Sequence, residues 1–251
     1  MITNNLSSGA NSNVTNLKML NSAILGYGET YNPANTLITP AALQTAYLLG
    51  LGAVNAVDNI LPANSNAKNV RSKAFDSMGK LATRAGNAFK SLVADESARV
   101  HIRSLIHLIQ RGRVNAVKSK ATINEAGEDP STVKENASHK SGYEKQLDNF
   151  YRLIQFLASF PAYKPNEAEL TVEALSAFHT ELTKDNQLVA DTQIQLDQSR
   201  MNREKVLYQP ITGLVHTCND SKSYIKSVFG ANSPEYKQIS KLKFGTYKNI
   251  M

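Results

Sequence analysis

The sequence predicts an all-α protein, an elongated antiparallel helical bundle. Apolar residues recur at steps of three and four along almost the whole chain, which is the period of an α-helix. No stretch keeps the strict apolar–polar alternation that is typical of half-buried strands. The chain has 251 residues, of which 41% are hydrophobic, and this is enough for a sizeable core in one elongated domain or in two small ones.

The predicted organisation is two helical units joined by a linker. The residues between the units are polar and mixed in charge, with few large apolar groups to offset the entropy of ordering them. The segments are a disordered N-terminus (1–12), a first helical unit (13–111), a polar linker (112–141), a second helical unit (142–244) and a tail (245–251).

In the first unit, residues with preferred terminal geometry mark the helix ends. Thr39 offers a side-chain oxygen as N-cap, Pro40 has the backbone angle of a first helical residue, and Pro62 is expected to end that helix. Gly50 and Gly52 are expected to be points of close packing. The next helix has apolar residues at spacings of four and three, typical of a seam for a partner helix. The predicted helices cover about 14–27, 39–62, 65–94 and 96–111.

In the second unit, Ser141 with Glu144 and Asn166 with Glu169 have the spacing of a capping box. The latter pair starts a very long helix, which at ~1.5 Å per residue spans roughly 65 Å and exceeds what a compact domain needs. Its segment Ala190–Glu204 has few apolar residues, so we expect it to protrude or to meet a partner through polar layers. The predicted helices cover about 141–157, 166–208, 211–230 and 233–242.

The two halves of the chain align with each other and predict an internal duplication. Tyr31-Asn-Pro33 precedes the second helix as Tyr163-Lys-Pro165 precedes the long one. The alignment needs gaps of several residues, and two amphipathic helices with similar caps can align this well without a common origin. A true duplication predicts two related units of three or four helices that pack with approximate twofold symmetry.

The basic excess is concentrated in one part of the chain. The formal net charge is +7, but residues 61–120 carry 12 basic against 3 acidic side chains, and residues 121–190 carry 6 against 11. One interpretation is charge complementarity between solvated helix faces, within the chain or between subunits. The other is a site for nucleic acid or another polyanion on the segment 68–120. No alternation of basic and aromatic residues accompanies the charge, which favours the first interpretation. The candidate polyanion-binding residues are Lys73, Lys80, Arg84, Arg99, Arg103, Arg111, Arg113, Lys118 and Lys120.

The sequence contains no motif for catalysis, metal binding or cofactor binding. Its five histidines are scattered, and no Glu-x-x-His pair of a di-metal bundle site occurs. Glycine-rich phosphate-binding motifs and the Gly-x-Ser-x-Gly nucleophile motif are absent. Cys218 lies on an apolar helix stripe and predicts a small buried side chain. We therefore expect no enzymatic activity, no metal, no cofactor and no small-molecule substrate.

The chain is expected to be cytoplasmic. Its single cysteine excludes an intramolecular disulfide framework, and its first residues have neither the basic nor the apolar region of a secretory signal. Residues 36–57 carry no charge, but polar and glycine residues leave too few consecutive apolar positions for a membrane span. We expect a buried central helix there; a membrane-active bundle that exposes residues 36–57 is the less favoured alternative.

The C-terminal run Lys222–Phe244 resembles the tail of a set of uncharacterised bacterial all-helical proteins of unknown function. The resemblance implies a bacterial, non-secreted helical protein and carries no site residues. The long seams of three-four spacing and the overlong helix lead us to expect a non-catalytic structural or protein-interaction bundle that self-associates.

Overall fold

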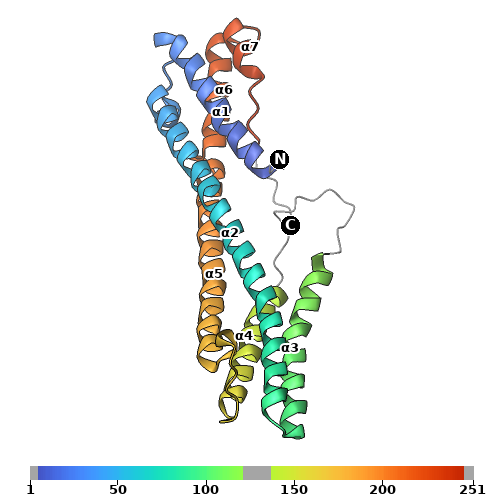
Figure 1. Ribbon diagram of the computed structural model, residues 1–251. Coiled ribbons are helices and arrows are strands. Elements are labelled where there is room, and N and C mark those ends of the chain that lie inside the picture. Colours follow the sequence, from blue (N-terminus) through green and yellow to red (C-terminus); the bar gives the residue numbers. More distant parts are fainter. Residues whose placement is uncertain (1–4, 121–136, 246–251) are drawn as a thin grey trace. The chain divides into compact units, whose positions relative to one another are not determined.

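The computed structural model describes residues 5–120 and 137–245, with side chains described over 9–110 and 142–245. All regular structure in these residues is helical and they contain no strand, which confirms the predicted all-α fold (Figure 1). Single-turn helices η1 (Gly28–Thr30), η2 (Thr36–Ile38) and η4 (Ala168–Leu170) lie in the loops. The α-helices are α1 (Asn5–Gly26), α2 (Pro40–Leu92), α3 (Glu96–Lys120), α4 (Ala137–Ala158), α5 (Val172–Tyr208), α6 (Leu214–Phe229) and α7 (Pro234–Ser240).

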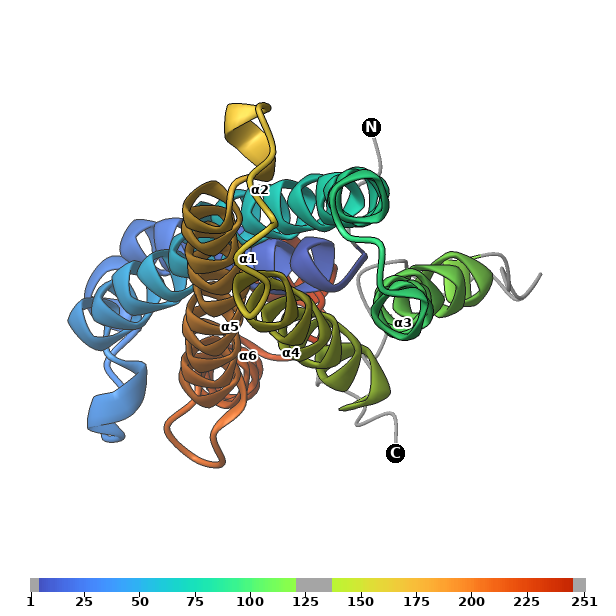
Figure 2. The ribbon, with the colours of Figure 1, turned by 60° about the horizontal axis from the view of Figure 1, so that its bottom comes forward.

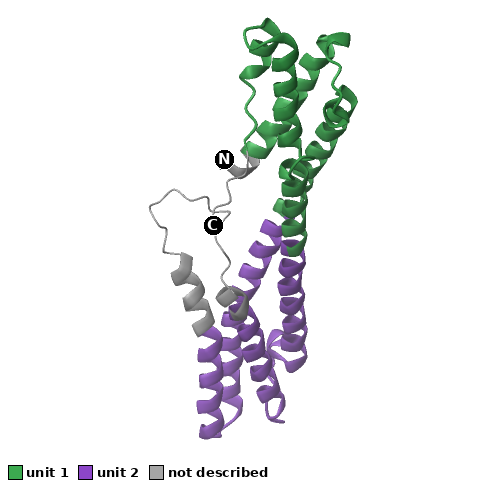
Figure 3. Ribbon diagram, turned by 180° about the vertical axis from the view of Figure 1, so that it is seen from behind, with its two compact units in different colours: residues 1–62, 194–251 green, residues 63–193 purple. Residues whose placement is uncertain are grey.

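The chain forms two compact units, coloured separately in Figure 3. Unit 1 consists of residues 1–62 and 194–251, and unit 2 consists of residues 63–193. Unit 1 therefore contains α1, α6, α7, the first part of α2 and the last part of α5. Unit 2 contains α3, α4 and the remaining parts of α2 and α5. Each compact unit thus combines segments from both halves of the sequence, because the two longest helices contribute residues to both units.

In unit 1, α1 packs against α6 and α7 around an apolar core. On α1 the buried side chains Leu17, Leu20 and Ile24 recur at steps of three and four, so one face of the helix is covered. Leu43 of α2 and Cys218 of α6 also belong to this core, and both are 0% exposed. Burial raises the pKa of the Cys218 thiol, which agrees with its prediction as a small buried side chain.

In unit 2, α3 packs along α4, and α4 runs beside α5 in both Figure 1 and Figure 2. Phe89 of α2 lies in the core of this unit and is 0% exposed. The centroid of its ring lies 5.6 Å from that of Phe156, 5.0 Å from that of Phe160 and 6.1 Å from that of Tyr163. These aromatic contacts join α2 to the end of α4 and to the loop that follows it.

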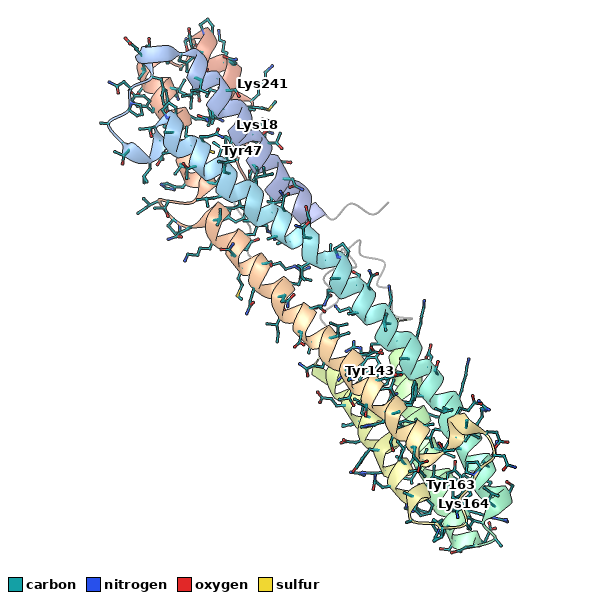
Figure 4. All side chains as sticks on the ribbon, turned by 60° about the vertical axis from the view of Figure 1, so that its left-hand side comes forward. Lys18, Tyr47, Tyr143, Tyr163, Lys164 and Lys241 are labelled. Carbon is teal, nitrogen blue, oxygen red and sulfur yellow. The ribbon has the colours of Figure 1, made fainter. Side chains whose placement is uncertain are left out.

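Polar side chains connect α2 with α5 in unit 2. The Asn64 amide donates to the Thr192 hydroxyl at 3.1 Å, and both side chains are buried. Arg71 donates to the side-chain oxygen Oδ1 of Asn186 at 3.1 Å, and its guanidinium lies 4.1 Å from the ring centroid of Tyr143, which Figure 4 labels. Buried polar groups need partners, so these bonds favour one register of the two helices over others.

The Tyr-x-Pro loops have the same local structure in both units. The Tyr31 hydroxyl donates to the Ile38 carbonyl oxygen in unit 1, and the Tyr163 hydroxyl donates to the Leu170 carbonyl oxygen in unit 2; both distances are 2.7 Å. Each tyrosine is 5% exposed, and Figure 4 labels Tyr163 in its loop. Each hydroxyl therefore closes a loop of the same size immediately before a long helix.

Two of the predicted caps are confirmed. The Thr39 hydroxyl accepts a hydrogen bond from the Ala42 amide at 3.3 Å at the start of α2. The Ser233 hydroxyl accepts one from the Tyr236 amide at 3.0 Å at the start of α7. In both helices the residue after the cap is a proline. Proline has no N–H, but the first N–H of a helix has no acceptor within the helix, so no helical hydrogen bond is lost.

The predicted capping boxes of the second half are wrong. α5 begins at Val172, and the Thr171 hydroxyl accepts from the Ala174 amide at 3.2 Å, so Asn166 is not its cap. The Tyr163 hydroxyl donates to the Leu170 carbonyl oxygen and so keeps residues 163–170 in a loop. The helix therefore starts after Leu170. α4 likewise begins at Ala137, before the predicted start at Ser141.

The helices are longer than predicted at several ends. α1 begins at Asn5, inside the segment 1–12 expected to be disordered, and Ala10 is 2% exposed because it belongs to the unit 1 core. α3 extends to Lys120 and α4 starts at Ala137, so helix replaces both ends of the predicted linker 112–141. Residues 121–136 of that linker lie outside the described residues.

α2 continues through Pro62, where the sequence predicts a break. Pro62 and Asp58 are both exposed, so water can solvate the Asp58 carbonyl that lacks its helical donor. Tertiary contacts compensate for the lost bond: Val57 is 5% exposed in unit 1, and Asn64 forms its bond to Thr192 in unit 2.

The glycines of α2 separate into one packed and one open position, and this gives a first prediction. A Cβ atom on Gly50 would lie 2.7 Å from Leu214 Cδ1 and 3.2 Å from Val14 Cγ2, whereas one on Gly52 would meet no atom within 4 Å. We expect Gly52→Ala to raise the free energy of unfolding by about 1 kcal/mol through helix propensity. Gly50→Ala is expected to lower it by about 1 kcal/mol, because overpacking outweighs that gain.

Urea denaturation followed by circular dichroism measures both effects, with each variant serving as the control for the other. Equal stabilisation by the two substitutions would contradict close packing at Gly50.

Candidate functional site

The basic residues singled out in the sequence lie on α2 and α3 of unit 2. Lys73 and Lys80, seven residues apart on α2, are exposed, and so is Arg103 on α3. Among the described residues, none of these three has a carboxylate within 4.0 Å. They are therefore available to an anionic partner.

Two other candidates are engaged within the chain. Arg84 forms an ion pair with Glu169 of η4, which joins the basic segment to the acidic one. The Arg99 guanidinium donates to the Val93 and Lys90 carbonyl oxygens, both at 2.8 Å, and so satisfies carbonyls at the C-terminal end of α2. Arg84 and Arg99 thus have structural partners that a polyanion would have to replace.

The remaining candidates are Arg111, Arg113, Lys118 and Lys120. They belong to the helical backbone of α3, but their side chains lie outside the described residues. Over the part of unit 2 whose side chains are described, twelve Lys or Arg face eleven Asp or Glu. The fold therefore brings the basic and acidic segments into one unit whose described charges nearly balance.

The residue types that bind metals do not gather within the described ranges. No cluster of three or more His, Cys, Asp or Glu side chains that could hold a metal ion occurs there. The His179 ring stacks on that of Phe150 with centroids 6.3 Å apart. His216 Nε2 lies 3.5 Å from Asp220 Oδ2 on the surface of α6.

The uncharged segment 36–57 is divided between the core and the surface of unit 1. Leu43 and Val54 are 0% and 2% exposed, whereas Leu48 and Leu49 are 56% and 59% exposed. No helix in the described part of the chain has an apolar stretch long enough to span a bilayer.

A groove lies between α2 and α5 in unit 1, and no sequence motif indicates it. Its volume is about 530 Å³. The lining contains amide, hydroxyl and small apolar side chains and no charged one: Ala56, Asn59, Ile60, Gln195, Gln198, Ser199 and Asn202. The sequence signal for it was the low apolar content of Ala190–Glu204, which contributes the α5 wall.

Large apolar side chains are exposed on α5 next to this groove. Ile194 is 56% exposed and Met201 is 64% exposed, and the two lie seven residues apart. Residues seven apart lie on the same face of a helix, so these side chains form one outward-facing surface. The segment Ala190–Glu204, predicted to protrude or to meet a partner, thus packs against other helices on one side and exposes apolar side chains on the other.

Comparisons of the chain with protein-family models, with characterised proteins and with solved structures found no match.

Proposed function

We propose that the chain is a non-catalytic helical bundle that acts through protein–protein contact and self-associates. The observation that carries this proposal is the exposure of Ile194 and Met201, one heptad apart on the outward face of α5. Heptad-spaced apolar residues on a helix surface are typical of a helix-to-helix contact. An isolated exposed apolar residue is common on protein surfaces, but a pair in register beside a groove favours a binding surface.

The oligomeric state tests this proposal. Sedimentation velocity of the full chain from about 1 μM to about 500 μM is expected to show a reversible shift to a larger species, because association follows mass action. A compact monomer over the whole range would contradict self-association.

An internal duplication, which we propose as the origin of the two units, fits this architecture. The loops at Tyr31 and Tyr163 have the same hydrogen bond, as described above. The buried positions of α1 also recur on α4 with identical spacing: Asn13, Val14, Leu17, Leu20, Asn21 and Ile24 correspond to Gln146, Leu147, Phe150, Leu153, Ile154 and Leu157.

A second candidate function, polyanion binding, is favoured by the exposure of Lys73, Lys80 and Arg103 without a described carboxylate nearby. We expect single-stranded DNA to bind weakly, with an affinity that falls steeply as salt rises, because binding releases counterions. Replacing the three residues by Gln is expected to reduce the salt slope by roughly 2. The matched control replaces three exposed lysines elsewhere in unit 2, Lys145, Lys164 and Lys184, by Gln. An equal loss in both triple variants would contradict a specific basic site.

A further inference from the structure

The outward face of α5 in unit 1 carries a stripe of side chains with Met201 at its centre. Asp197 and Lys205 lie four residues before and after Met201, and Ile194 lies seven residues before it. Tyr208, seven residues after Met201, packs instead against the core of unit 1, where its hydroxyl accepts a hydrogen bond from the Asn13 amide at 3.3 Å. Steps of three, four and seven keep residues on one side of an α-helix, so the four exposed side chains form a continuous stripe.

The stripe faces away from the core of unit 1. On this segment of α5 the buried residues Leu196 and Leu207 are 2% and 0% exposed, and they alternate with the stripe along the helix. Met201 in the stripe is 64% exposed, and the Asp197 side chain is 54% exposed. Asp197 Oδ1 lies 3.7 Å from Arg200 Nη1 of the same helix. Exposed ion pairs of this kind are weak, so a cation from a partner can compete for the carboxylate.

We infer that this stripe is the surface through which two copies of the chain pair, with α5 of one copy antiparallel to α5 of the other and Met201 on the twofold axis. The inference rests on the self-association proposed above. In this arrangement Asp197 faces Lys205 of the other copy, and the twofold axis creates this ion pair twice. The two Met201 side chains contact each other, and the Ile194 side chains lie at the two ends of the paired surface.

The positions of the charged residues favour a second copy of the chain as the partner that binds the stripe. Acidic and basic residues at equal distances from the centre complement an identical helix in the antiparallel direction, whereas a parallel copy would bring like charges together. The opposite charges of Asp197 and Lys205 cancel, so the stripe offers no net attraction to a uniformly negative partner such as nucleic acid. The stripe covers about three turns of one helix. Such a surface buries less than the ~800 Å² per partner of a standard interface, so the dimer is expected to depend on concentration.

A charge exchange tests the direction and register of the pairing. Sedimentation equilibrium of the full chain measures the dimer dissociation constant. Asp197→Lys and Lys205→Glu are each expected to raise it roughly tenfold, because each places like charges opposite one another twice. The double variant regenerates both ion pairs and is expected to return to within about threefold of the wild type.

A second substitution tests the centre of the stripe. Met201→Arg places two guanidinium groups against each other on the axis and is expected to raise the dissociation constant at least about a hundredfold. The matched control is Met19→Arg on α1, where the methionine is 53% exposed outside the stripe and the dissociation constant should stay unchanged. Circular dichroism verifies that each variant is folded as the wild type is.

The outcomes separate this inference from the proposed function. A wild type that stays monomeric overturns both. A dimer that Met201→Arg affects no more than Met19→Arg leaves self-association standing and overturns the stripe. A double variant that associates no better than the single ones overturns the antiparallel register.

Discussion

Replacing Phe89 by Ala is expected to lower the free energy of unfolding by roughly 3–5 kcal/mol, the range for truncating a fully buried aromatic side chain. Phe89 is 0% exposed, and its ring contacts those of Phe156, Phe160 and Tyr163. The substitution removes these contacts and leaves a cavity that three rigid rings cannot easily fill. Urea denaturation followed by circular dichroism measures the loss.

Leu92→Ala is the control for this prediction. Leu92 lies three residues further along α2 and is 41% exposed, so its truncation is expected to cost less than about 1 kcal/mol. Similar losses for the two variants would mean that Phe89 does not organise the core of unit 2.

Raising the pH from 10 to 12 is expected to destabilise the protein through Tyr31 and Tyr163. Burial raises the pKa of each phenol from 10 to about 12 in the folded state. The folded protein therefore holds these protons more tightly than the unfolded chain does. The resulting stability is fully present below pH 10 and is lost as the pH rises through about 12. The loss amounts to roughly 2 kcal/mol for each tyrosine.

Phenylalanine substitutions separate this effect from general alkaline unfolding. Tyr163→Phe is expected to cost about 1–3 kcal/mol at neutral pH, because the Leu170 carbonyl loses its donor. The same variant should lose less additional stability between pH 10 and pH 12 than the wild type does. Tyr151→Phe, at a residue that is 51% exposed, is the control and should change neither quantity. A pH profile of Tyr163→Phe that parallels that of the wild type would contradict the assignment.

Helix interiors and some helix ends could be predicted from local sequence. The caps at Thr39 and Ser233 depend on a side chain and the backbone amide three residues later, so a few consecutive residues define them. Pro62 shows the limit of such reasoning. Its local tendency to end a helix is real, but burial at Val57 and the bond from Asn64 to Thr192 compensate for it, and both depend on residues distant in the sequence.

For the candidate surfaces too, local sequence predicted some features and contacts between distant residues decided the others. Charge counting found the basic segment, but it could not show that Arg84 pairs with Glu169 or that Arg99 binds carbonyls at the end of α2. The sequence also marked Ala190–Glu204 as poor in apolar residues. It could not show which side of that helix packs against α2 and which side leaves Ile194 and Met201 exposed.

The sequence by itself determined that this protein is all-α, which residues form helices over most of their length, and that Cys218 is a buried small side chain. These properties follow from a period of three to four residues and from contacts within one helical turn. The tertiary structure alone decided that each compact unit contains parts of both halves, that Gly50 and not Gly52 is a packing point, and which face of α5 is open. These properties depend on which faces of distant helices meet, and helical periodicity is equally compatible with many such arrangements.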